Sequence, residues 1–138
     1  MIYEGACHCG AARAALRTEL SPPPVRACQC GFCRRHGAAT TSDPAGKLTL
    51  SFASTPRVYR FASRASEVLI CPGCGVYVAS CIDTREGKRA TLNIVGMAVA
   101  ELITLAPSPV SYEAEGAEAK RARRLANWTP TEIAGNAR

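Results

Sequence analysis

Three cysteines lie within the segment CQCGFC, at positions 28, 30 and 33. Two further pairs flank this segment: Cys7 and Cys9 are separated by one residue, and Cys71 and Cys74 by two. Zinc prefers soft thiolate ligands, and a short turn with such spacing can present two or three sulfurs to one ion. The seven cysteines therefore predict metal binding, and the chemistry available to the chain depends on how they group.

The two pairs could form one closed zinc site. In the segment CPGCG, Pro72 presets its own φ angle, while Gly73 and Gly75 permit the positive φ angles at which backbone amides point toward sulfur. Neither pair can complete a tetrahedron alone. Together, the four thiolates would hold a structural ion that ties the N-terminus to the middle of the chain.

The other three, Cys28, Cys30 and Cys33, would leave one corner of a zinc tetrahedron open. A zinc ion with four protein ligands is structural, whereas one with three keeps a position for water or substrate. The spacings alone do not establish which motifs share an ion. His36 is an alternative fourth ligand, because C-x-C-x-x-C-x-x-H could close the tetrahedron, although Gly37 argues against this reading.

Three segments of the chain resemble, in order, the motifs of a known family. GACHCGAARAAL, CQCGFCRRHG and LICPGCG are similar to those of the glutathione-dependent formaldehyde-activating (GFA) family, which includes the centromere-protein-V-like proteins. The resemblance covers about residues 3 to 80 and implies one GFA-type domain over 1–138, mainly β, with a zinc-bearing antiparallel sheet of the β-tent type. It also implies two zinc ions per chain, a structural one on Cys7, Cys9, Cys71 and Cys74 and a catalytic one on Cys28, Cys30 and Cys33.

The same resemblance implies an activity. The family's archetype is described as adding glutathione to formaldehyde to give S-hydroxymethylglutathione, which makes it formally a carbon–sulfur lyase. We therefore expect a zinc-dependent enzyme acting on thiol adducts of aldehydes or a related small electrophile, with glutathione as a candidate thiol. The chain departs from the family pattern at Met97 and Ala98, where many members have Leu-Asp, and in its C-terminal third, which includes KRARRLANWTP. Those segments would help to shape the substrate pocket.

Several residues other than these seven cysteines have both a functional and a structural interpretation. Arg34 and Arg35 follow the last thiol of CQCGFC and could attract the carboxylate of a substrate, or could merely balance thiolate charge in a solvated turn. Cys81 is expected to be a buried free cysteine. Trp128 is expected to anchor the C-terminal helix rather than to line the pocket. A redox role for the C-x-x-C pair is disfavoured, because no thioredoxin-like βαβ pattern surrounds it.

The net charge of +6 first suggests a nucleic-acid partner. Seven thiolates binding two zinc ions would lower that charge to about +3, so the basicity is mild. The rival function is a non-catalytic zinc module that binds nucleic acid or a protein partner through Arg121, Arg123 and Arg124. The open zinc corner favours the enzyme, and we expect a small-molecule partner rather than nucleic acid.

The sequence favours a cytoplasmic location. The segment MIYEGACHCG lacks the apolar run of a secretory signal. The most apolar window, TLNIVGMAVAELITLA, carries Asn93 and Glu101 and falls short of a membrane span. Disulfides are disfavoured in the cytosol, so metal binding is the expected use of the cysteines, which number eight.

Short β-branched and aromatic runs predict a mostly antiparallel β domain. The predicted strands cover 47–52, 57–61, 67–70, 76–80 and 91–95. Tyr77, Ala79 and Cys81 are expected to share one face of their strand. A helix is predicted over about 112–127, with Ser111 as its N-cap, because its acidic residues precede its basic ones as the helix dipole favours.

Overall fold

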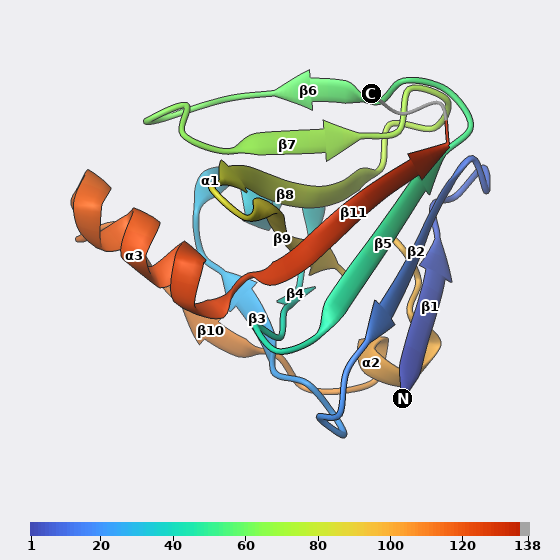
Figure 1. Cartoon of the computed structure of the whole chain (residues 1–138), viewed down its shortest axis with the longest axis horizontal. Coiled ribbons are helices and arrows are strands. Elements are labelled where there is room, and N and C mark those ends of the chain that lie inside the picture. Colours follow the sequence, from blue (N-terminus) through green and yellow to red (C-terminus); the bar gives the residue numbers. More distant parts are fainter. Residues whose placement is uncertain (136–138) are drawn as a thin grey trace.

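Strands dominate the computed structural model, which describes residues 1–135 (Figure 1). In chain order the elements are β1 (Ile2–Ala6), β2 (Ala12–Arg17), β3 (Val25–Cys28), α1 (Gly31–His36), β4 (Thr40–Thr41), β5 (Lys47–Phe52), β6 (Arg57–Tyr59), β7 (Glu67–Ile70), β8 (Tyr77–Thr84), β9 (Gly87–Asn93), α2 (Ala100–Ile103), β10 (Ser108–Val110), α3 (Ala117–Asn127) and β11 (Thr129–Gly135). The predicted mainly β fold with a short C-terminal helix is confirmed. None of the helices in this part of the chain is long and apolar enough to cross a membrane.

The strands form one open, mixed sheet that branches at β9. One edge of β9 pairs with β8, and the other pairs with β11 through residues 88–90 and with β4 through residues 92 and 93. From β11 the sheet continues through β5 and β2 to β1, and from β4 it continues through β3 to β10. Strand β8 leads to β7 and then to β6 (Figure 1).

The sheet is mostly antiparallel, as predicted, but two of its strand pairings are parallel. Strand β11 runs parallel to β5, and β10 runs parallel to β3, whereas the other pairings among residues 1–135 are antiparallel. Parallel neighbours need a long crossover connection, which runs of neighbouring residues do not reveal. Both unpredicted parallel strands lie in the C-terminal third of the chain.

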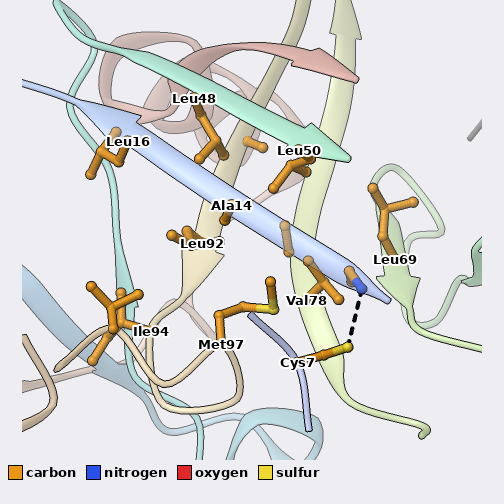
Figure 2. Close-up of a cluster of buried hydrophobic side chains, with 14 of the residues drawn as sticks. Cys7, Ala14, Leu16, Leu48, Leu50, Leu69, Val78, Leu92, Ile94 and Met97 are labelled. Carbon is orange, nitrogen blue, oxygen red and sulfur yellow. Dashed lines mark hydrogen bonds between the residues drawn. The ribbon is translucent and has the colours of Figure 1, made fainter. Parts of the chain in front are cut away.

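The main core lies against one face of β2 and β5. Leu48, Leu50 and Phe52 of β5 alternate inward, as the predicted strand over 47–52 requires, and each pairs with an inward-facing residue of β2. Other elements add side chains to the same cluster. Its most deeply buried large members include Leu16, Leu48, Leu50, Leu92, Ile94 and Met97 (Figure 2).

A β-bulge in β8 corrects the predicted face of Tyr77. The pairing of β8 with β7 shifts between Ala79 and Tyr77, which leaves Val78 as an extra residue. Ala79 and Cys81 therefore face the main core, whereas Tyr77 packs in a second buried cluster with Cys33. Strand alternation predicted a shared face, but alternation is interrupted at a bulge.

Helix α3 begins later than predicted, and its N-cap is Gly116 rather than Ser111. The preceding residues form a turn in which the Glu115 N–H donates to the Tyr112 carbonyl at 3.1 Å. Arg123 holds this turn, because its Nε donates to both carboxylate oxygens of Glu115, at 3.1 and 2.9 Å. Its guanidinium carbon also lies 3.4 Å from the centroid of the Tyr112 ring. These contacts override the charge pattern that predicted an earlier start.

Gly5 provides a test of how tightly the N-terminal hairpin packs. A methyl group at position 5 would overlap the carbonyl oxygen of Met97 and lie 2.9 Å from Cγ2 of Val99. The Ala6 N–H donates to that same carbonyl at 2.7 Å, so the backbone cannot retreat without losing a hydrogen bond. Gly5→Ala is therefore expected to lower the free energy of unfolding by about 1–3 kcal/mol in urea titrations.

Gly116→Ala is the matched control for this substitution. An added methyl at Gly116 meets nothing within 4 Å, and the small loss at the N-cap is opposed by the lower entropy of the unfolded chain, so we expect a change below about 0.5 kcal/mol. Equal effects of the two substitutions would contradict the packing described here.

Candidate functional site

Four of the predicted ligands meet between two turns. Cys7 and Cys9 lie between β1 and β2, while Cys71 and Cys74 lie between β7 and β8, and the four sulfur atoms are all within 4.8 Å of one another. The Sγ atoms of Cys7 and Cys9 are 3.8 Å apart, and those of Cys9 and Cys71 are 3.7 Å apart. Tetrahedral zinc with Zn–S bonds of about 2.3 Å places its sulfurs roughly 3.8 Å apart. The cluster therefore fits a metal ion of this kind.

Backbone amides point at these sulfurs, although of the two glycines predicted to have positive φ angles only Gly75 has one, at 79°. The Ala12 N–H donates to Cys7 Sγ at 3.2 Å, the hydrogen bond drawn in Figure 2. Burial opposes ionisation of Cys74, but hydrogen bonds from the backbone of Cys9 and Val76 outweigh it and lower the pKa of Cys74 to about 6. Burial raises the pKa of Cys71 to about 11. The cluster thus favours thiolate at its half-exposed rim and thiol at its buried side.

The other three cysteines form a second cluster, around the start of α1. Cys28 ends β3, Cys30 is the N-cap of α1 and Cys33 lies in its first turn, where the Cys33 N–H donates to Cys30 Sγ at 3.4 Å. Their sulfur atoms lie within 4.8 Å of one another. Among the described residues, no fourth His, Cys, Asp or Glu places a ligand atom in this group. The cluster can therefore hold a metal ion with one coordination position free of protein.

His36 does not close this second cluster. Its ring packs against Phe32, with centroids 4.4 Å apart, and lies 5.8 Å from the Tyr77 ring. Helix α1 ends directly after it at Gly37, which has a positive φ of 58°. The side chain is thus used for aromatic packing, and the alternative of a three-cysteine, one-histidine site is not supported.

The second cluster carries a thiolate even without a metal ion. A hydrogen bond from the Cys33 thiol lowers the pKa of Cys28 to about 5, despite the opposing effect of burial. The same hydrogen bond, together with burial, raises the pKa of Cys33. Hydrogen bonding within the group thus favours the thiolate form at Cys28 and the thiol form at Cys33.

These three thiols face a cavity of about 110 Å³. One water requires roughly 10–15 Å³, so the cavity can hold a small organic molecule or one end of a larger one. Tyr77 also lines it, and its hydroxyl lies 3.0 Å from the Ser80 Oγ. Burial raises the pKa of Tyr77, which keeps the phenol protonated at neutral pH. Sequence reasoning missed Tyr77 because the bulge that turns it toward the cavity has no signature among neighbouring residues.

The cations of the cavity are not those that the sequence suggested. Arg26, Arg123 and Arg124 line it, whereas Arg34 and Arg35 do not. Both residues of the latter pair are exposed on α1, and Arg35 Nη1 donates to the Gly31 carbonyl at 3.3 Å. A contact between this pair and a substrate stays a prediction. The basic run of α3 contributes two half-buried arginines to the wall of the cavity and is more than a solvated helix face.

Trp128 and Cys81 have the buried positions expected of them. Trp128 is 7% exposed at the end of α3, so it anchors the helix as expected, but it also lines the cavity, the role that the sequence analysis favoured less. Cys81 is a buried free cysteine, as predicted, with its Sγ 3.9 Å from a carboxylate oxygen of Glu67. Burial raises the pKa of Cys81 to about 11, so this thiol stays protonated at neutral pH.

Comparison with known proteins gives one family and one solved structure. Residues 2–115 match the model of the family described as glutathione-dependent formaldehyde-activating enzyme (GFA). This match extends beyond the 3–80 range of the motifs and ends before α3. In fold, the chain is similar to the crystal structure of a Rhodobacter sphaeroides protein, with a TM-score of 0.60 and 24% identity over 79% of this chain and 99% of that one. None of the curated proteins compared with the chain matches it.

The Arg123–Glu115 pair allows a pH-dependent test of the cavity wall. Hydrogen bonding from Arg123 lowers the pKa of Glu115. The carboxylate therefore stabilises the folded protein above the pKa of an unfolded glutamate, and this contribution is lost as the pH falls through the folded value. Glu115→Gln is expected to lower the free energy of unfolding by up to about 1 kcal/mol near pH 7, and by less near pH 3, in denaturant titrations.

Glu132→Gln is the control for that experiment. Glu132 lies 3.2 Å from Lys47, but the two side chains are 65% and 59% exposed, so solvent screens the pair and no measurable change is expected at either pH. If Glu115→Gln behaves like Glu132→Gln, the salt bridge does not stabilise the wall.

Proposed function

Because the chain belongs to the glutathione-dependent formaldehyde-activating enzyme family, we propose that it is a zinc-dependent carbon–sulfur lyase acting on thiol adducts of aldehydes or a related small electrophile. The observation that carries this proposal is the second cysteine cluster. Its three thiols face a cavity, and no fourth protein ligand joins them among the described residues. A metal site closed by protein would serve structure alone, whereas an open one admits a substrate.

We propose two zinc ions per chain, with different roles. Cys7, Cys9, Cys71 and Cys74 would hold a structural ion, in keeping with a donor set of four sulfurs at zinc-like separations. The second ion would be held by Cys28, Cys30 and Cys33. Zinc bound there would supply Lewis acidity, which lowers the pKa of a thiol and polarises a carbonyl group.

The chain's own residues would orient the reactants and handle one proton. In the direction of addition, the thiolate sulfur forms a bond to the carbonyl carbon, and the carbonyl oxygen gains a proton; cleavage reverses both changes. Tyr77 is our candidate hydrogen-bond donor to that oxygen, because its protonated hydroxyl lies in the same cavity as the thiols. The aromatic rings of Phe32 and Phe61 would limit the access of water to the reacting atoms.

Three further parts of the proposal rest on family membership and on thiol chemistry. Glutathione is the thiol that the family name indicates, and we propose it as the first thiol to test. Arg34 and Arg35, exposed beside the cluster, would contact only a part of the substrate that extends outside the cavity. A cytoplasmic location would keep the seven clustered thiols reduced and able to bind metal.

Metal content tests the assignment of the clusters. Protein purified under reducing conditions without chelator is expected to hold two zinc ions per chain by elemental analysis. Cys30→Ser should lose the second ion but keep its fold by circular dichroism. Cys71→Ser should lose the structural ion and unfold at a markedly lower temperature, because a buried ligand of the cross-link is removed.

Cys81→Ala is the control for thiol removal in general. Cys81 is buried outside both clusters, so this variant should keep both zinc ions. Folded wild-type protein without zinc, or loss of zinc from Cys81→Ala equal to that from Cys30→Ser, would refute the cluster assignment.

Catalysis is tested by following the exchange between formaldehyde and its glutathione adduct by nuclear magnetic resonance, with the spontaneous rate subtracted. Wild-type protein and Cys81→Ala are expected to accelerate the exchange, and Cys30→Ser is expected to lose at least about 100-fold of that acceleration. If protein with two zinc ions accelerates neither this exchange nor those of other small aldehydes and thiols, the lyase proposal is wrong. Salt-dependent nucleic-acid binding would then favour the non-catalytic zinc module.

A further inference from the structure

Two parts of the chain line the cavity: one lies within the segment that matches the family model, and the other lies beyond it. Its thiols and Tyr77 belong to the segment that matches the family model, residues 2–115. Part of its wall comes from α3 and the residue after it, which lie beyond that match. Arg124 and Trp128 are members of this added wall. Features of the cavity that depend on them are properties of this chain and do not follow from the family match.

The side chain of Arg124 makes no hydrogen bond or salt bridge in the described structure. Its Nε is buried and makes no hydrogen bond. Its contact is with an aromatic face, since the guanidinium carbon lies 5.0 Å from the centroid of the Trp128 ring. A guanidinium is costly to bury when its donors lack an acceptor, and a carboxylate in the cavity would supply an acceptor to Arg124.

The other two arginines of the cavity are already engaged. Arg123 is paired with Glu115 at 2.9 Å, and Arg26 Nη1 donates to Ser42 Oγ at 3.1 Å. Arg124 is therefore the arginine of the cavity wall that is left without a hydrogen-bond acceptor.

We propose that Arg124 binds the carboxylate of a small acidic substrate, so that α3 selects for molecules with a thiol or aldehyde at one end and a carboxylate at the other. This inference rests on the proposed function, because it concerns the same cavity. The cavity volume of about 110 Å³ is enough for a small molecule of this kind. Arg124 acts as a specificity-determining residue, and its substitution leaves the thiols of the metal site in place.

A competing explanation is that Arg124 only balances the charge of the thiolates. Its guanidinium interacts electrostatically with Cys28 as well as with the neighbouring side chains. If balance were its sole role, its loss would weaken the metal site and every thiol bound there to the same extent. A carboxylate-binding role predicts a loss confined to acidic ligands.

The test compares thioglycolate with 2-mercaptoethanol, two small thiols of which only the first has a carboxylate. Trp128 is the chain's only tryptophan and lines the cavity beside Arg124, so its fluorescence reports binding without turnover. Wild-type protein should bind thioglycolate about 10- to 100-fold more tightly than 2-mercaptoethanol, as expected for a hydrogen-bonded ion pair. Arg124→Gln should abolish most of this preference.

Arg121→Gln is the matched control. Arg121 lies on the same helix, is exposed, does not line the cavity and donates only to the Asp83 carbonyl, at 3.3 Å. It should leave the preference for thioglycolate unchanged. Thermal unfolding and zinc content establish that each variant is intact. If Arg124→Gln does not fold, Arg124→Met, which fills a similar volume without a buried amide, takes its place.

Three outcomes would overturn the proposal: no preference for thioglycolate in the wild-type protein, an unchanged preference after substitution of Arg124, or equal weakening of both thiols. Because binding is measured without turnover, the result is separable from the proposed reaction. A preference that depends on Arg124 in a protein with no lyase activity would support this inference and refute the proposed function. Lyase activity without the preference would do the reverse.

Discussion

Four sulfur atoms meet from two turns that are far apart in the sequence, and Cys9 and Cys71, which are 62 residues apart, are neighbours in this cluster. The core beside them is modest, because two of the three inward-facing residues of β2 are alanines, and a methyl group buries little apolar area. A metal ion bound by these four thiolates would fix β1 and β2 relative to β7 and β8 at a point where the core has few large side chains. The position of β8, and with it that of Tyr77, depends on this constraint.

The second cysteine cluster depends on the first through the sheet. Strand β8 pairs with β9, β9 pairs with β4, and β4 pairs with β3, which ends at Cys28. Helix α1 then places Cys33 against Tyr77, on the face of β8 that the bulge creates. A regular β8 would have turned the phenol into the main core, away from the thiols. The positions of the thiols relative to Tyr77 in the cavity thus depend on the pairing of four strands, β8, β9, β4 and β3.

The cysteine clusters could be predicted from the sequence because each motif is local: the spacing within a single turn already determines which sulfurs can share an ion. Grouping Cys7 with Cys71 needed one further argument, namely that neither cysteine pair alone can fill the four positions of a zinc tetrahedron. Tyr77 could not be found in this way, since a bulge depends on the register between two strands. The start of α3 was also misplaced, because Arg123 makes its decisive contacts with Tyr112 and Glu115 through tertiary structure. Sequence patterns did not reveal the contacts that form only when the fold brings separate segments together.

The division of the cavity between thiols and helix has a chemical consequence. A group that holds a metal ion must keep its ligands within a few tenths of an ångström, so its residues tolerate little change. The wall made by α3 has no such requirement, because Arg124 and Trp128 line the cavity without belonging to the group of possible metal ligands. Substitutions in α3 can therefore change which molecule enters while the reactive centre stays the same. Arg124, whose Nε the surrounding protein leaves without a hydrogen bond, would supply one half of such a recognition contact.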